Sequence, residues 1–362
     1  MTARPLVVHD YFAIRGGGER TVLTLAAALG AGLMYGYRTG DTFEAAMFPE
    51  ERHDLALPDF LRARGLRVLA LSAAFARARR TIAGYPLRFF SGAVAPVGAP
   101  LEREGGRNIY YCHTPPRFLY DLREFLESRM SATSRTAARL LLPSFQRQYE
   151  QAVGRMDLIV ANSRNVQKRI SRYLGRDSVV VYPPSDTSIR WRGQQGYYLS
   201  TARLTEIKRV DRIVDAFLRM PGRQLIVASG GELEGQLRAR AGNAPNIRFT
   251  GWIDEETLRQ LIGEAIATIY VPVDEDFGMS PVESMAAGKP CIGVAEGGAL
   301  ETLIHGSTGL LLKPGFAIDD LVAAVLAMTP QRALSMRSDC EARAGLFSRQ
   351  TFIDRMREIA TG

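Results

Sequence analysis

Short apolar runs alternate with helix-like segments along this 362-residue chain, and a double proline interrupts the alternation once. Runs of this length, rich in β-branched residues and separated by helices, predict doubly wound parallel sheets of the α/β class. Tyr182-Pro183-Pro184 lies at the interruption, and two prolines cannot continue a strand ladder. Since the alternation then restarts, we expect two domains, residues 1–186 and 187–345, followed by a C-terminal segment, residues 346–362.

Each expected domain contains a series of short strands. In the first domain we expect strands at Leu6–Asp10, Gly32–Tyr37, Arg67–Leu71, Asn108–Cys112, Asp157–Ala161 and Ser178–Tyr182. In the second domain we expect strands at Tyr197–Ser200, Gln224–Ala228, Asn246–Thr250, Ala267–Val271, Pro290–Val294 and Gly309–Leu312. Ligands of open parallel sheets bind beyond the carboxyl ends of the strands. Functional residues should therefore follow these runs, in a cleft between two facing carboxyl edges.

The composition is that of a globular chain with enough apolar material for two cores, at 46% hydrophobic and 23% charged residues. Its three cysteines are far apart in the sequence, which indicates neither a disulfide framework nor a zinc knuckle and suits a reducing cytosol. His9 and Asp10 interrupt the first apolar run too early for a signal peptide. Glycines interrupt the longest uncharged stretch, Thr21–Tyr37, so no transmembrane segment is expected.

The most informative stretch is Glu275–Glu301, which follows a predicted buried strand. Its chain turns at Phe277-Gly278, and Ser280, Pro281 and Glu283 then occupy the N-cap, first and third positions of an expected helix. A strand, a glycine turn and a helix N-terminus together gather unpaired N–H groups at the sheet edge, which suits a phosphate. Glu283 is then either half of a capping box or a ligand-binding carboxylate. Glu275 is either a solvated acid or a ligand-binding one.

Two motifs of the first domain follow expected strands. Gly16, Gly17 and Gly18 come shortly after the first strand, where glycines allow positive φ and close approach of a ligand, although a plain tight turn is the alternative. The pattern is not Gly-x-Gly-x-x-Gly, which disfavours a nicotinamide site. His113 stands where Asn108–Cys112 ends, and the prolines after it prevent continuation of the strand. Its side chain is therefore expected at the carboxyl edge.

Candidate ligand-binding residues also follow three strands of the second domain. Arg203 and Lys208 come after Tyr197–Ser200, and solvated charges are the alternative reading. Gly230 ends the next strand, and Trp252 and Ile253 follow the third.

Glu275 and Glu283 enclose seven residues, Phe277-Gly278 among them, and this arrangement resembles the Glu-x7-Glu signature of retaining GT-B glycosyltransferases of family four, the glycosyl transferases group 1. Gly297-Gly298-x-x-Glu301 and His305-Gly306-x-Thr308-Gly309 match the same family. The His113-Thr-Pro stretch is similar to that of bacterial mannosyltransferases that build O-antigen and exopolysaccharide. The resemblance implies two Rossmann-like domains facing a cleft, an acceptor-binding first and a nucleotide-sugar-binding second. It also implies a C-terminal helix that returns to the first domain.

The resemblance implies roles for individual residues as well. Glu275 would hold the sugar hydroxyls and Glu283 the ribose hydroxyls, while Arg203 and Lys208 contact the donor diphosphate. His113 would approach the donor sugar. The remaining expected donor-binding positions are Gly16, Gly17, Gly18, Gly230, Trp252, Ile253, Phe277, Gly278, Met279 and Ser280, with Trp252 near the base.

We therefore expect a retaining transferase that moves mannose from GDP-mannose to a hydroxyl of a polyprenyl-diphosphate-linked oligosaccharide, in bacterial surface polysaccharide synthesis. The nucleotide sugar is a co-substrate, and neither a cofactor nor a metal is expected, since no Asp-x-Asp motif with an evident role is present. A transferase using a UDP-sugar, a non-catalytic nucleotide-sugar-binding protein, and a glycosidase or phosphorylase are the alternatives. The expected location is the cytoplasm, peripheral on the inner face of the membrane.

The net charge of +8 indicates an anionic partner. The stretch Leu61–Phe90 mixes arginines with large apolar residues and has no acid, a composition that suits an anionic membrane surface. An ordinary solvated helix face beside a core strand is the alternative. Nucleic acid is not expected as a partner, because no recognised nucleic-acid-binding module is present.

Overall fold

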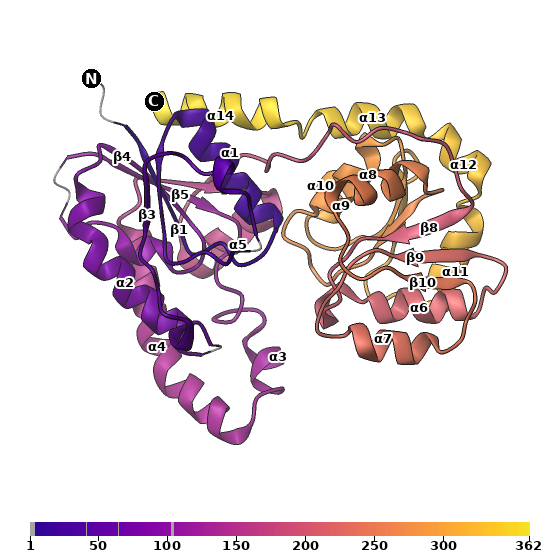
Figure 1. Ribbon diagram of the computed structural model, residues 1–362, viewed down its shortest axis with the longest axis horizontal. Coiled ribbons are helices and arrows are strands. Elements are labelled where there is room, and N and C mark those ends of the chain that lie inside the picture. The colour runs from indigo at the N-terminus through magenta and orange to yellow at the C-terminus, as the bar shows by residue number, and fades with distance from the viewer. Residues whose placement is uncertain (1–3, 41, 64, 103–104) are drawn as a thin grey trace. The chain divides into compact units, whose positions relative to one another are not determined.

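The computed structural model of the protein describes residues 4–40, 42–63, 65–102 and 105–362. It separates into two compact units (Figure 1). The first consists of the chain up to Tyr182 together with Phe352–Gly362, and the second of Pro183–Thr351. Each unit is a parallel sheet flanked by helices, so the predicted α/β class is confirmed for both.

The sheet of the first unit has the strand order β3-β2-β1-β4-β5-β6-β7. Its strands are β1 (Leu6–His9), β2 (Gly32–Tyr35), β3 (Arg52–Asp54), β4 (Leu87–Ser91), β5 (Arg107–Cys112), β6 (Leu158–Ala161) and β7 (Val179–Val180). The helices are α1 (Gly17–Leu29), α2 (Leu66–Ala83), α3 (Arg123–Glu127), α4 (Ala132–Gly154) and α5 (Arg164–Leu174), with 3-10 turns η1 (Ala45–Met47), η2 (Asp59–Leu61) and η3 (Ala95–Gly98). The strand order reverses between β1 and β4, and a reversal of this kind marks the ligand-binding edge of an open sheet.

The sheet of the second unit has the order β10-β9-β8-β11-β12-β13. Its strands are β8 (Tyr197–Ser200), β9 (Gln224–Val227), β10 (Ile247–Phe249), β11 (Thr268–Tyr270), β12 (Cys291–Val294) and β13 (Gly309–Leu312). Its helical segments are η4 (Glu206–Lys208), α6 (Val210–Leu218), α7 (Glu234–Ala241), α8 (Glu255–Glu264), α9 (Met279–Ala286), α10 (Ala299–Thr302), α11 (Ile318–Ala327), α12 (Pro330–Ser335) and α13 (Arg337–Gly345). Every strand expected in this half of the chain is present.

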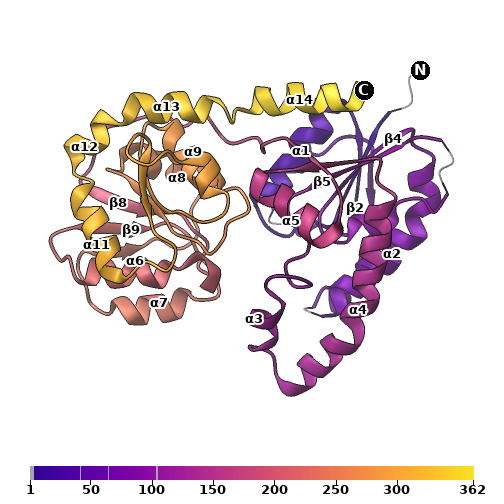
Figure 2. The same cartoon turned by 180° about the vertical axis from the view of Figure 1, so that it is seen from behind.

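Apolar residues of the first unit form a core on each face of its sheet. Along β1, Leu6 and Val8 belong to the core that α2, α4 and α5 cover, whereas Val7 belongs to the core that α1 covers. This alternation is the period-2 geometry of a strand buried on both faces. Figure 2 shows α2 and α4 side by side along this unit.

The last helix, α14 (Arg349–Thr361), packs on the α1 side of the first unit. Phe352 meets the ring of Tyr111 edge to face at 5.7 Å, and Met356 is buried in the same core. Nε of Arg357 donates a hydrogen bond to the carbonyl of Ala28 at 3.1 Å. The C-terminal segment therefore belongs to the first unit from Phe352 onward.

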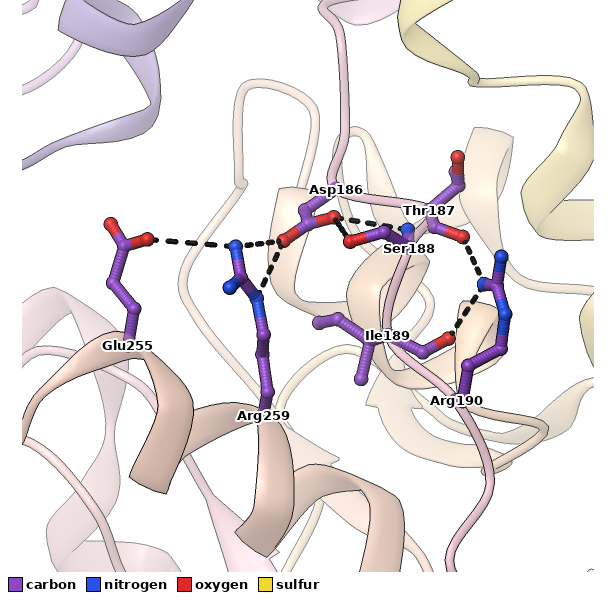
Figure 3. Close-up of polar contacts among 7 residues, drawn as sticks. All are labelled: Asp186, Thr187, Ser188, Ile189, Arg190, Glu255 and Arg259. Carbon is purple, nitrogen blue, oxygen red and sulfur yellow. Dashed lines mark hydrogen bonds and ion pairs between the residues drawn. The ribbon is translucent and has the colours of Figure 1, made fainter.

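The segment after the double proline is fixed to the second unit by Asp186 (Figure 3). Its carboxylate accepts hydrogen bonds from the backbone N–H of Ser188 at 3.0 Å and from the guanidinium of Arg259 on α8 at 3.0 and 3.1 Å. Burial opposes ionisation, but these bonds outweigh it, and the pKa of Asp186 is held below its ordinary value. The chain passes from one unit to the other at Tyr182–Pro183, close to residue 186, which the sequence suggests as the boundary.

The expected strand Arg67–Leu71 is wrong, since these residues lie in α2. The four apolar residues after Arg67 fit a buried helix segment as well as a strand. Leu71, Phe75, Ala78 and Ile82 recur at helical spacing, and all are buried. Two strands, β3 and β4, went unpredicted. β4 carries Arg88, which is only 1% exposed and donates to the carbonyl of Tyr85 at 2.6 Å and to Asn108 Oδ1 at 3.1 Å.

These elements also account for the basic and apolar stretch Leu61–Phe90. Most of its large apolar residues face the core: Leu71, Phe75, Ile82, Phe89 and Phe90 are buried, whereas Leu66 is 51% exposed. The buried residues are not available to a membrane, and the alternative of a core helix and strand with a solvated basic face describes this stretch better. No helix among the described residues is long and apolar enough to cross a membrane.

Candidate functional site

Three side chains meet at the carboxyl edge of the second unit's sheet, beyond β8 and β11. Nζ of Lys208 lies 2.5 Å from Oε2 of Glu275 and 2.9 Å from Oη of Tyr270. The hydroxyl of Tyr270 also lies 2.9 Å from Oε2 of Glu275. Lys208 and Glu275, both predicted site residues, are thus brought into direct contact. Tyr270 was missed, because within the buried run Ala267–Val271 nothing in the sequence distinguishes it from a core residue.

The contacts of Lys208 fix its charge. Burial by itself lowers the pKa of a lysine, but Tyr270 and Glu275 outweigh burial here, and the pKa of Lys208 is raised. Burial, followed by the charge of Glu275, raises the pKa of Tyr270. At neutral pH the cluster therefore contains an ammonium group held against a neutral phenol.

The helix that follows Glu275 begins earlier than expected. α9 starts at Met279, and its N-cap is Gly278, with φ of 88° and no side-chain cap. The expected capping box is therefore wrong: Ser280 and Pro281 lie in the first turn, and Glu283 lies beyond it. Gly278 turns the chain two residues sooner because glycine adopts the left-handed conformation without steric cost. Glu283 is half-buried and lies five positions after the N-cap, not at the third helical position.

The loop after β12 packs directly on the Glu275 turn. The N–H of Gly298 donates to the carbonyl of Glu275 at 2.7 Å, and a Cβ on Gly297 would lie 2.3 Å from the same oxygen. The glycine pair is therefore required for a close backbone approach. Phe277 is 2% exposed and packs against Phe347 with ring centroids 5.4 Å apart, so its side chain is part of the core.

Three more predicted residues lie beyond β8, β9 and β10. The Leu204 N–H donates to the carbonyl of Gly230 at 3.1 Å, which places the Arg203 segment beside the end of β9. Trp252 is 71% exposed, and its indole covers Gly230, where a Cβ would lie 2.5 Å from Nε1. Arg203 is exposed, and its side chain makes no hydrogen bond or ion pair within the described part of the chain. Unlike the exposed Trp252 and Arg203, Ile253 is partly buried and packs against the core under α8.

In the first unit, His113 lies beside the N-terminus of α1. A Cβ on Gly18 would lie 3.7 Å from Nε2 and Cε1 of the His113 ring, which is ordinary van der Waals contact. α1 begins at Gly17 with Gly16 as its N-cap, and Gly16 has φ of −93°. The expected positive φ is wrong for Gly16, Gly17 and Gly18. These glycines open a helix rather than form a left-handed turn.

A buried serine connects two histidines behind this loop. Oγ of Ser91, at the end of β4, lies 2.9 Å from Nε2 of His113, and the Ser91 carbonyl lies 3.2 Å from Nδ1 of His9. Burial lowers the pKa of His113 to about 4, and burial together with His113 lowers that of His9 to about 3. Both rings are therefore neutral at neutral pH. Ser91 was missed because β4 itself was missed.

Asp10 fixes the same edge of the first unit. Its buried carboxylate accepts backbone N–H bonds from Ala93 at 2.8 Å, Val94 at 2.9 Å and Ala95 at 2.7 Å. Burial raises the pKa of Asp10 despite these bonds. This carboxylate holds the turn after β4 and thereby the position of Ser91. Over residues 4–40, 42–63, 65–102 and 105–362, no group of three or more His, Cys, Asp or Glu side chains is placed to hold a metal ion.

Residues 181–344 match the model of the family described as glycosyl transferases group 1. The alpha-1,3/1,6-mannosyltransferase ALG2 of Dictyostelium discoideum is 26% identical over 295 residues, which cover 65% of this chain and 68% of that protein. The mannosylfructose-phosphate synthase of Agrobacterium fabrum is 30% identical over 167 residues, which cover 41% of this chain and 37% of that protein.

Solved structures resemble the chain over nearly its whole length. Anabaena HepE in complex with UDP and glucose superposes with a TM-score of 0.77 at 20% identity, over 99% of both chains. Sucrose-phosphate synthase of Thermosynechococcus elongatus gives a TM-score of 0.76 at 18% identity, over 98% of both chains. At these identities the likeness establishes the fold, and the fold predicted from the sequence is confirmed.

Proposed function

We propose that the chain, whose residues 181–344 match the glycosyl transferases group 1 model and whose fold is that of GT-B proteins, transfers a sugar from a nucleoside diphosphate to a hydroxyl, with retention. The observation that carries this proposal is the Lys208–Glu275 pair at the sheet edge, next to the N-terminus of α9. A diphosphate needs positive charge as it leaves, and a sugar needs hydrogen-bond acceptors. The pair supplies one group of each kind.

We assign the diphosphate to Lys208, Arg203 and the first N–H groups of α9. Two cations near a diphosphate contribute on the order of a few kcal/mol each at an effective dielectric of about 20. An exposed guanidinium such as that of Arg203 can turn to a phosphate without first breaking an ion pair. These charges are those of the protein itself, so transfer is proposed to need no metal ion.

The donor proposed is GDP-mannose. The similarity to an ALG2 mannosyltransferase and to a mannosylfructose-phosphate synthase favours mannose. A UDP-sugar is the second candidate, favoured by the likeness to HepE, whose structure contains UDP and glucose. Trp252 is compatible with either donor, because an exposed indole stacks on guanine and on uracil alike. The neutral ring of His113 is assigned to the donor sugar, as the family resemblance implies.

The acceptor proposed is a polyprenyl-diphosphate-linked oligosaccharide at the inner face of the membrane. The N-terminal half of α4 supports a membrane contact better than Leu61–Phe90 does, because Leu140 is 75% and Leu141 is 45% exposed there. Residues 123–147 contain five arginines and two glutamates, a net +3. Exposed leucines among cations suit an anionic lipid surface. Sedimentation with phosphatidylglycerol vesicles should fall in Leu140→Ser/Leu141→Ser, and unchanged sedimentation would remove this surface.

The function is tested with a panel of nucleotide sugars. A donor present at 100 times its Kd should add about 2.7 kcal/mol to the free energy of unfolding, which identifies base and sugar. Consumption of that donor only with a lipid-linked acceptor separates transfer from glycosidase or phosphorylase activity. Donor binding without turnover would show the non-catalytic alternative. Full activity of Glu275→Gln and His113→Ala would overturn the site.

A further inference from the structure

The carboxylate of Glu296 joins the two loops that carry Lys208 and Glu275. Its oxygens accept hydrogen bonds from Nη1 and Nη2 of Arg209 at 3.2 and 3.4 Å, and from the backbone N–H of Asp274 at 3.1 Å. Arg209 directly follows Lys208, and Asp274 directly precedes Glu275. One side chain therefore holds a neighbour of each member of the site pair.

Both residues that Glu296 holds have an unfavourable backbone conformation. Arg209 has φ of 52° and Asp274 has φ of 41°. In the part of the chain that the structure describes, they are two of the three non-glycine residues with positive φ. This conformation is uncommon for residues other than glycine, although aspartate adopts it more readily than arginine, and surrounding contacts help to maintain it. The hydrogen bonds of Glu296 are contacts of that kind, because they act on the guanidinium of one strained residue and the N–H of the other.

The ion pair of Arg209 and Glu296 is partly buried, and the residues after Glu296 contact the Glu275 turn. The side chains of Arg209 and Glu296 are 19% and 15% exposed, which makes a two-point guanidinium–carboxylate contact firmer than a surface ion pair. Gly297 and Gly298 follow Glu296 and pack on the backbone of Glu275 through the close contacts described above. A displacement of Glu296 therefore reaches Glu275 by two routes.

We propose that Arg209 and Glu296 are positioning residues that hold Lys208 and Glu275 at the separation that sugar transfer requires. We call this arrangement the Glu296 clamp. Its catalytic consequence rests on the proposed function, whereas its structural consequence, an ordered pair of loops, does not. Neither residue needs to touch the donor, because small displacements of positioned groups are enough to lower the rate.

Arg209→Gly separates positioning from stability. Glycine adopts φ near 52° without strain, so the loss of the ion pair is offset and the melting temperature should change by no more than about 2 °C. The value of kcat should nevertheless fall about tenfold, with the donor KM within about threefold of wild type, because the loops are less well ordered in the transition state. Wild-type kcat in Arg209→Gly would overturn the proposal.

The Glu296 series provides a graded test. Glu296→Gln keeps an acceptor for the Asp274 N–H but loses the charge, whereas Glu296→Ala loses both. The loss of kcat should therefore be smaller in Glu296→Gln than in Glu296→Ala. The matched control is Asp319→Asn, which breaks the exposed Arg219–Asp319 pair of the same unit and should leave kcat unchanged. Equal effects of the Glu296 variants and the control would contradict the clamp.

Hydrogen exchange distinguishes failure of the clamp from failure of the proposed function. In Glu296→Ala, amide exchange should accelerate at Asp274 and Gly298, whose N–H groups are bonded in the intact loops. If the wild type transfers no sugar but this acceleration occurs, the clamp stands and the proposed function is wrong. If the wild type transfers sugar and neither exchange nor kcat responds, the clamp is wrong.

Discussion

Nε2 of His113 lies 2.9 Å from the hydroxyl oxygen of Ser91, which is fully buried at the end of β4. A neutral imidazole carries one N–H, and a hydroxyl that donates to Nε2 leaves that proton on Nδ1. Ser91 is thus able to fix both the tautomer and the orientation of His113 beside the first turn of α1.

Ser91→Ala removes this partner and should lower kcat/KM about tenfold while changing the melting temperature by only a few degrees, because one buried hydrogen bond is lost. The control is Ser72→Ala, which removes another buried hydroxyl of the first unit, bonded at 2.8 Å to the carbonyl of Val68 within α2. Steady-state kinetics and thermal melts of both variants provide the comparison. Equal kcat/KM in the two variants would show that Ser91 is only structural.

The two histidines should make the protein sensitive to mild acid. The pKa values of His9 and His113 are lowered to about 3 and about 4 in the folded protein, whereas an unfolded histidine titrates near its ordinary value of 6.5. Between these pH values the unfolded chain binds more protons than the folded protein. The contribution of the two histidines to the free energy of unfolding is therefore full above pH 6.5 and falls as the pH decreases toward 4. Carboxylates contribute to acid unfolding as well. The measurement is therefore the slope of melting temperature against pH, which should flatten in His9→Asn and in His113→Asn. An unchanged slope would contradict this origin.

Gly230 and Trp252 supply a prediction about the nucleotide. Gly230→Ala places a Cβ 2.5 Å from Nε1 of the indole, so Trp252 must leave its position. Affinity for GDP and for UDP should each fall about tenfold, since the loss concerns stacking rather than base recognition. Gly235→Ala in α7 is the control: its Cβ meets nothing within 4 Å, and alanine favours a helix. Calorimetric titration of both variants tests this, and unchanged affinity in Gly230→Ala would remove Trp252 from the site.

Most of the architecture could be predicted from the sequence where local pattern decides it. The strands of the second unit are short apolar runs between clear turn residues, and the glycines at 278, 297 and 298 lie where a turn or a close backbone approach requires them. β4 could not be recognised, because Arg88 interrupts its apolar run and its burial depends on carbonyls supplied by the fold.

In the site, too, local sequence pattern predicts some features, whereas others depend on contacts between distant residues. The motifs identify Lys208 and Glu275, but the contacts of Lys208 with Tyr270 and with Glu275 join residues 62 and 67 positions apart. Local pattern does not encode such contacts. The capping box failed for a related reason: Ser280, Pro281 and Glu283 have the right spacing, but Gly278 starts the helix before them.

Glu283→Gln tests the proposed ribose contact, because Glu283 lies beyond the first turn of α9 and glutamine keeps the size of the side chain and one of its acceptor oxygens. The melting temperature without ligand should stay within about 2 °C of wild type, since glutamine and glutamate have similar helix propensity. Affinity for the nucleoside diphosphate should fall about tenfold, as expected for a lost charge-assisted hydrogen bond. Wild type should also prefer the diphosphate over its 2′-deoxy analogue, and this preference should shrink in Glu283→Gln but not in the control Glu341→Gln on α13. If calorimetry finds the same preference in all three proteins, Glu283 does not hold the ribose.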